Sequence, residues 1–129
     1  MKLLTTIFAA IITMTTAAQQ AEISVNTKNA TYTSQFTQLL KHKPFGFTIG
    51  VTNQREAIMT LRAQPKIENS NIVLNFQQGI TWDDNKTYYY QATGLGYDFG
   101  KSILFTNLSL RNNRKELTAG LQVSLAIKL

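Results

Sequence analysis

The chain has 129 residues, of which 43% are hydrophobic, and thirteen Lys and Arg against seven Asp and Glu give it a net charge of +6. It has no cysteine and one histidine, which excludes a disulfide framework and a metal site with two histidine ligands. The basic residues are scattered along the chain, so we expect no nucleic-acid partner. Anionic lipid or lipopolysaccharide headgroups are the expected counter-charge.

Residues 1–18 are expected to form a signal peptide. Lys2 gives a positive start, an apolar run with interspersed threonines follows, and small residues precede the expected cleavage site after Ala18. Cleavage after Ala21 is the second choice. A retained transmembrane anchor is the alternative, but the run is short and interrupted for a membrane span. Residues 19–129 are then long enough for a single domain.

The rest of the chain alternates between apolar and polar side chains, and this period of two predicts β-strands. We expect strands near residues 22–27, 31–40, 45–52, 57–64, 72–82, 87–100, 102–110 and 117–129. Residues 31–40 are the least regular, and a single helical turn at Phe36, Leu39 and Leu40 is the alternative there. Segments rich in turn-forming residues separate the strands, including residues 83–86 and 111–115. The pattern predicts seven or eight antiparallel strands.

The final strand has the clearest alternation. At about 3.3 Å per residue and a tilt of about 40°, its length spans about 28–33 Å, close to the hydrocarbon core of a bilayer. One face is small or polar, and the other is an unbroken apolar row. We expect the following residues of that row to face lipid: Leu117, Leu121, Val123, Leu125, Ile127 and Leu129.

The faces opposite the apolar rows carry small or weakly polar residues instead of many charges. Examples are Gly46, Thr48, Gly50, Gly79, Thr81, Gly94, Gly96, Gly120 and Ser124. Such residues suit the crowded interior of a narrow closed barrel, where isolated charges such as Arg62, Asp98 and Lys128 could pair. A soluble sandwich or calyx is the alternative, with the apolar face inward and a charged face in water.

Aromatic residues gather at both ends of one expected hairpin. At one end they flank the turn at residues 83–86, and at the other they lie beside Lys101. Trp and Tyr collect at membrane interfaces, where one side of the ring is apolar and the other is wet. Cross-strand aromatic pairing in a soluble sheet is the alternative. The expected interface aromatics are Trp82, Tyr88, Tyr89, Tyr90, Tyr97 and Phe99.

With its signal segment, its alternating strands at 45–52 and 72–82 and its terminal strand at 117–129, the chain resembles small bacterial outer-membrane β-barrels. The resemblance covers much of the expected mature chain and rests on a general pattern, without a family-specific motif. It implies an all-β fold, an antiparallel meander of seven or eight strands closed into a small barrel. About 110 residues require either very short loops or a partner chain, such as a homo-oligomer. Such barrels commonly end in an aromatic residue, whereas this chain ends in Leu129.

The single histidine, His42, lies between two lysines and before Pro44, where a solvated turn explains it. Some lipid-modifying barrels use a Ser, a His and a carboxylate. Ser34 is near His42 in sequence, but nothing places a carboxylate beside them. No pair of carboxylates indicates acid–base catalysis either. We therefore do not expect an enzyme.

Two further segments could suggest a ligand. Asp83-Asp84-Asn85 lacks the spacing of a calcium loop, and Gly94-Leu-Gly96 lies inside a strand pattern, without the helix that a phosphate cradle requires. We expect neither a cofactor nor a metal. The predicted function is a non-enzymatic outer-membrane barrel with a structural or binding role in the cell envelope. The alternative is a secreted soluble β-sheet module that binds a protein partner or an apolar ligand.

Overall fold

The computed structural model describes residues 2, 5, 19–27, 31–40, 43–112 and 116–129. The predicted signal peptide at residues 1–18 lies outside the described residues, apart from Lys2 and Thr5. The solvated turn predicted at His42 lies outside them as well.

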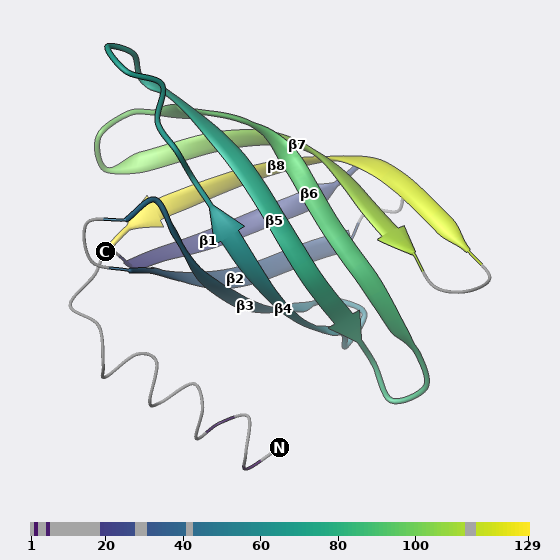
Figure 1. Cartoon of the computed structure of the whole chain (residues 1–129). Helices are drawn as coiled ribbons and strands as arrows, with labels where there is room; N and C mark the ends of the chain where they lie inside the picture. Colours follow the sequence, from purple (N-terminus) through teal and green to yellow (C-terminus); the bar gives the residue numbers. More distant parts are fainter. Residues whose placement is uncertain (1, 3–4, 6–18, 28–30, 41–42, 113–115) are drawn as a thin grey trace.

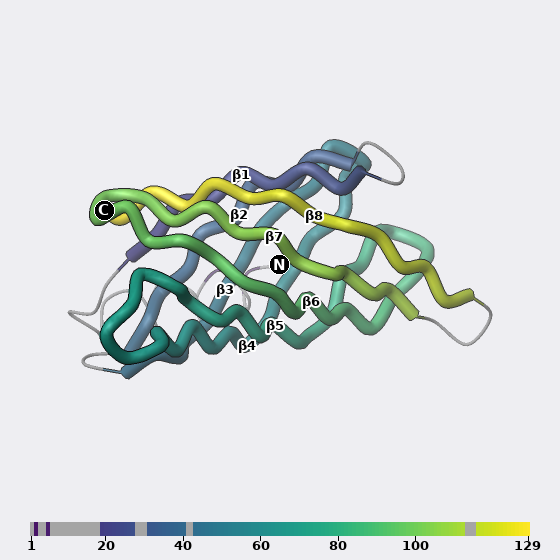
Figure 2. The backbone as a smooth tube through the Cα atoms, turned by 90° about the horizontal axis from the view of Figure 1, so that it is seen from above, coloured from purple at the N-terminus to yellow at the C-terminus, as the bar shows by residue number. Residues whose placement is uncertain are grey.

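Eight antiparallel strands form one closed barrel (Figure 1). Each strand pairs with the next along the chain, and β8 pairs with β1, so that the sheet has no free edge. In Figure 2 the yellow β8 runs alongside the purple β1 at this closure. The predicted all-β meander closed into a small barrel is therefore confirmed. The strands are β1 (Gln19–Asn26), β2 (Thr31–Leu39), β3 (Phe45–Thr52), β4 (Ala57–Ala63), β5 (Ile72–Trp82), β6 (Thr87–Asp98), β7 (Ser102–Asn112) and β8 (Leu117–Lys128).

Pairing extends two strands beyond their alternating patterns, whereas β6 ends at Asp98, before the predicted end at Gly100, and β2, β4 and β8 each end one residue before the prediction. β1 begins at Gln19, before the predicted start at Glu22, since Gln19 pairs with β2 and Gln20 pairs with β8. Arg111 was predicted in a turn but lies in β7, where it pairs with Tyr90 of β6. Residues 31–39 form a strand, so the alternative of a helical turn there is wrong.

Short turns let one chain close the barrel. β5 and β6 are joined by residues 83–86 alone, and Asp83 organises that connection by accepting hydrogen bonds from the backbone N–H groups of Asn85 (2.8 Å) and Lys86 (2.7 Å). The turn between β6 and β7 needs Gly100, whose φ of +100° is a conformation that side chains strongly disfavour. The short connections therefore provide the compactness that a single-chain barrel of this length requires.

The strands differ in length around the barrel. β1 to β4 have seven to nine residues, whereas β5 to β8 have eleven or twelve. The longer ribbons of β5 and β6 are visible at the front of Figure 1. Because a strand rises about 3.3 Å per residue, β1 to β4 are shorter than β5 to β8, although the bridge between Lys66 and Val73 continues the pairing with β5 beyond the end of β4.

Candidate functional site: the barrel interior and its outer belt

An ion pair between Arg62 of β4 and Glu22 of β1 lies inside the barrel. Two parallel hydrogen bonds of 2.8 and 3.0 Å join the guanidinium to the carboxylate. Arg62 also donates to Thr37 (3.1 Å) and through Nε to Asn75 (2.8 Å). This bidentate geometry, with most of the Arg donors used, is the kind that compensates a buried charge for its lost hydration. The pair therefore links four strands across the barrel.

The aromatic ring of Phe105 covers one side of this ion pair. The Arg62 guanidinium carbon lies 4.9 Å from the ring centroid, a cation–π distance. Gly96 on the neighbouring strand leaves room for the ring, because a Cβ atom at Gly96 would lie 2.5 Å from Phe105 Cδ1. Phe105 packs with Val73, Ile103 and Ala126 in a small buried apolar cluster. The apolar cluster therefore packs against the buried ion pair through the Phe105 ring.

A layer of amide and hydroxyl side chains fills the middle of the barrel. Gln77 donates to Gln35 (2.8 Å) and to Thr60 (2.9 Å), and Gln35 donates in turn to Ser24 (3.3 Å). Ser124 of β8 completes the layer with a 2.9 Å bond to Ser24. Buried polar groups are stable when they find such partners, so this network satisfies the polar side chains in the middle of the barrel.

Each mouth of the barrel has its own ion pair. At one end Arg111 contacts Glu56, and its guanidinium carbon lies 4.6 Å from the centroid of the Tyr88 ring. At the other end Lys128 binds Asp98 at 2.8 Å, and the Lys66 amine lies 3.6 Å from the same carboxylate. Together with the Arg62–Glu22 pair in the middle, ion pairs therefore lie at both mouths of the barrel and between them.

The interior is filled at the level of Tyr90 and Gln122. The cavity between these residues has a volume of about 20 Å³, which holds about one water molecule. Tyr90 and Gln122 are joined by a 3.3 Å hydrogen bond across it. At this level the side chains fill most of the cross-section of the barrel.

The residues of the predicted lipid-facing row lie on the outside of the barrel. Leu117, Leu121, Val123, Leu125, Ile127 and Leu129 are all exposed on the outer surface. Their neighbours on β8, Gln122, Ser124 and Ala126, are buried inside. The structure therefore assigns the apolar row to the outer surface and the small-residue row to the interior.

The predicted interface aromatics divide between the two faces. Trp82, Tyr89, Tyr97 and Phe99 lie on the outside, and the last two rings are 4.8 Å apart. Tyr90 is only 4% exposed, because alternation turns it inward beside Gln122, so its prediction as an interface residue is wrong. The same parity turns Tyr88 inward, where its ring stacks on Arg111, and that prediction is corrected too.

Sequence reasoning missed Glu22, the partner of Arg62. The signal was present, because Gln20, Glu22, Ser24 and Asn26 alternate with apolar residues and therefore share the inward face of the first strand. Only the closure of β1 onto β8 and the inward direction of β4 bring Glu22 to Arg62. The pairing across the barrel depends on geometry that local periodicity does not contain.

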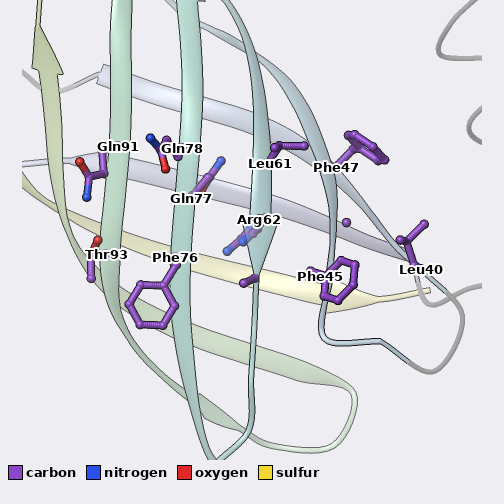
Figure 3. A pocket seen from close by; sticks show the side chains of 12 residues that line it. Leu40, Phe45, Phe47, Leu61, Arg62, Phe76, Gln77, Gln78, Gln91 and Thr93 are labelled. Carbon is purple, nitrogen blue, oxygen red and sulfur yellow. The ribbon is translucent and has the colours of Figure 1, made fainter.

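The outer surface has an open groove of about 520 Å³ across β3 to β6 (Figure 3). Phe45, Phe47, Leu61 and Phe76 give it apolar walls. Gln78, Gln91 and Thr93 add polar groups at its β5–β6 side. Gln78 and Gln91 are directly opposite each other in the β5–β6 register, so two amides adjoin on a mainly apolar surface.

The described residues contain no group of three or more His, Cys, Asp and Glu side chains that could hold a metal ion. No helix among them is long and apolar enough to cross a membrane. Asp83 and Asn85 form the β5–β6 turn, where hydrogen bonds from the backbone of Asn85 and Lys86 hold the pKa of the Asp83 carboxyl below its ordinary value. No protein-family model, no curated protein and no solved structure matches this chain.

Proposed function

We propose that this protein is a non-enzymatic outer-membrane β-barrel with a structural or binding role in the cell envelope. The observation that carries the proposal is the polarity of its two faces. Polar and charged side chains are buried inside the barrel, whereas large apolar side chains are exposed around it. This arrangement is typical of transmembrane barrels and is the inverse of a water-soluble sheet.

The filled interior supports a structural or binding role over transport. The central Arg62–Glu22 pair and the layer around Gln77 use the interior for packing and hydrogen bonds. The outer surface and the turns are then the parts of the molecule available to lipid or to a partner. The predicted signal peptide supports export, and the excess of Lys and Arg over Asp and Glu suits anionic lipid headgroups.

The soluble alternative requires a different distribution of side chains. A calyx that binds an apolar ligand would direct its apolar row inward, around a cavity. Here the buried apolar cluster contains only Val73, Ile103, Phe105 and Ala126 among the described residues, and the cavity beside Tyr90 is the size of one water molecule. No specific observation favours the soluble module.

Trp82 provides a direct test because it is the only tryptophan in the chain. The mature protein would be refolded into phosphatidylcholine vesicles with bromine on the acyl chains near the interface. We expect strong quenching of Trp82 fluorescence and a shift in gel mobility on heating. Fluorescence unaffected by brominated lipid, together with recovery of the native protein in the soluble periplasm, would overturn the proposal.

Spin labels at positions 122 and 123 sharpen the test. We expect lipid-dissolved oxygen to reach a label at Val123, which is on the outside, and a water-soluble relaxant not to reach it. A label at Gln122, which is inside, should be strongly immobilised, provided that heat-modifiable migration shows that the variant has folded. If the label at 123 is shielded from both reagents, the apolar row is covered by protein instead of lipid.

A further inference from the structure

Two neighbouring glutamines interrupt the apolar outer surface of the barrel. Gln78 lies within β5 (Ile72–Trp82) and Gln91 within β6 (Thr87–Asp98), away from both strand ends. Both are exposed, and Phe76, Ile80 and Leu95 are exposed apolar residues on the same face. If the barrel spans a membrane as proposed above, these amides lie in the hydrocarbon region.

The two amides have unused hydrogen-bonding capacity. Gln78 donates one hydrogen bond to the Tyr89 hydroxyl, and the described residues provide no further partner for its amide. Gln91 forms no side-chain hydrogen bond with a described residue, although it lies directly opposite Gln78. A primary amide has two donors and an acceptor oxygen with two lone pairs, and each unsatisfied group in hydrocarbon is costly.

The wall around these glutamines is concave and mainly apolar. Gln78 and Gln91 line one side of the groove of about 520 Å³, and Phe45, Phe47 and Leu61 line its far side. An apolar hollow with two amides at its edge is a surface that a partner with apolar and amide groups can fill.

We propose that the β3–β6 face binds a second copy of this chain, forming a two-fold dimer with the Gln78 and Gln91 amides at its centre. The inference rests on the proposed membrane location. Two copies inserted in the same direction are related by an axis along the membrane normal, so equivalent residues stay at the same depth. Each amide of one copy then meets an amide of the other.

A second copy fits this surface better than lipid does. An acyl chain offers no hydrogen-bond partner to Gln91, whereas an amide satisfies another amide as both donor and acceptor. Glutamines are known to join transmembrane segments through such contacts. The aromatic walls of the groove supply apolar area around the central polar pair.

Single-cysteine cross-linking tests the proposal because the chain has no cysteine of its own. Thr93→Cys would place a thiol on the same face as Gln91, and Ile23→Cys would place one on β1, four strands away from β5 in the barrel order. Both residues face outward, so the variants are matched. In vesicles at low protein density, we expect oxidation to give covalent dimers with Thr93→Cys and few with Ile23→Cys. Equal yields would contradict the proposal.

The amides are tested with a Gln78→Leu, Gln91→Leu double variant, with Ser34→Leu on β2 as the control for replacing an outward polar residue. Fluorescence energy transfer between labelled copies in vesicles would measure the dimer. We expect the double variant to weaken dimerisation about tenfold or more and the control to leave it unchanged. A monomeric wild-type barrel, or a double variant with unchanged affinity, would overturn the proposal. Heat-modifiable migration and Trp82 quenching separately report whether each variant is inserted, so failure of the membrane location is recognised as such.

Discussion

Leu61 and Arg62 are neighbours on β4, but their environments are the reverse of those found in a water-soluble sheet. Leu61 is 62% exposed, whereas Arg62 is 2% exposed and is the largest fully buried side chain among the described residues. In soluble proteins Arg is almost never fully buried unless it is paired, and large aliphatic residues are usually inside. The comparison shows that this sheet presents large apolar side chains outward and polar side chains inward.

The same contrast holds along the whole of β8. Leu121, Val123 and Leu125 lie outside, and Gln122 and Ser124 between them lie inside. The inner face is stabilised by specific partners, since each buried charge or amide needs its own hydrogen bonds. The outer face needs only an apolar surrounding. The effect of a substitution on the inner face should therefore depend on the partner of the replaced side chain, and under the proposed membrane location the effect of one on the outer face should depend on its depth.

The largest effect is expected from removing one member of the buried ion pair. Arg62→Leu would leave the Glu22 carboxylate buried without its cation. Breaking a buried pair in this way costs about 3–5 kcal/mol. Urea unfolding in detergent micelles, followed by tryptophan fluorescence, would measure the loss in the free energy of unfolding.

A double variant separates the partner effect from the loss of packing. In Arg62→Leu, Glu22→Leu both charges are removed, and apolar replacement of a buried pair is often neutral or stabilising. We expect the double variant to regain most of the stability lost by Arg62→Leu alone. The single variant Glu22→Leu completes the comparison. If the double variant loses the sum of the stabilities lost by Arg62→Leu and Glu22→Leu, the ion pair does not act as a unit, and the stability of the inner face depends less on specific partners than we expect.

The cost of a charge on the outer face should depend on its depth in the proposed membrane. Val123 lies in the interior of β8, so Val123→Arg places a charge far from either mouth, at a cost of about 2–4 kcal/mol in transmembrane barrels. Leu117→Arg is the matched control, because Leu117 begins the same strand on the same face. Near the interface the cost falls to about 0–1 kcal/mol. Equal losses at the two positions, measured by refolding into vesicles, would argue against a membrane around this face.

The third largest loss of stability is expected from overpacking the inner face at Gly96. In Gly96→Ala the new Cβ atom would lie 2.5 Å from Phe105, whose ring covers Arg62, so ring and guanidinium must shift together. Overpacking of this kind typically costs about 1–3 kcal/mol. Gly120→Ala is the control, because its Cβ would first meet the end of the Asn26 side chain, which can move. The midpoint of urea unfolding should fall more for Gly96→Ala than for Gly120→Ala.

Most of the fold could be predicted from the sequence, because a period of two is a local property. The row from Leu117 to Leu129 identifies its strand and its two faces without reference to the rest of the chain. The length of β1 could not be predicted in the same way, since Gln19 and Gln20 are polar neighbours that become strand only through pairing with β2 and β8.

The site was predicted less completely than the fold. Tyr88, Tyr89 and Tyr90 are consecutive, so composition alone suggests one aromatic cluster, although alternation divides them between the interior and the outside. Applying the period of two to each tyrosine would have corrected this prediction. The contact between Glu22 and Arg62 is different in kind, because it joins β1 and β4 across the barrel and depends on closure.

The smallest effect is expected in the turns, where charges lie outside both faces. Hydrogen bonds from the backbone N–H groups of Asn85 and Lys86 hold the pKa of Asp83 below its ordinary value of 3.8. A carboxyl with a lowered folded-state pKa contributes stability above its unfolded pKa and loses it as the pH falls through the folded value. Asp83→Asn keeps a side-chain oxygen that can accept both hydrogen bonds but removes the charge. We expect it to lower the thermal unfolding midpoint slightly at pH 7, with the difference from wild type disappearing below the folded pKa.

Asp84→Asn is the matched control, because Asp84 accepts no hydrogen bond from a described residue, and its effect should be smaller at pH 7. An Asp83→Asn effect that persists unchanged in strong acid would show that the turn depends on the shape of the side chain and not on its charge.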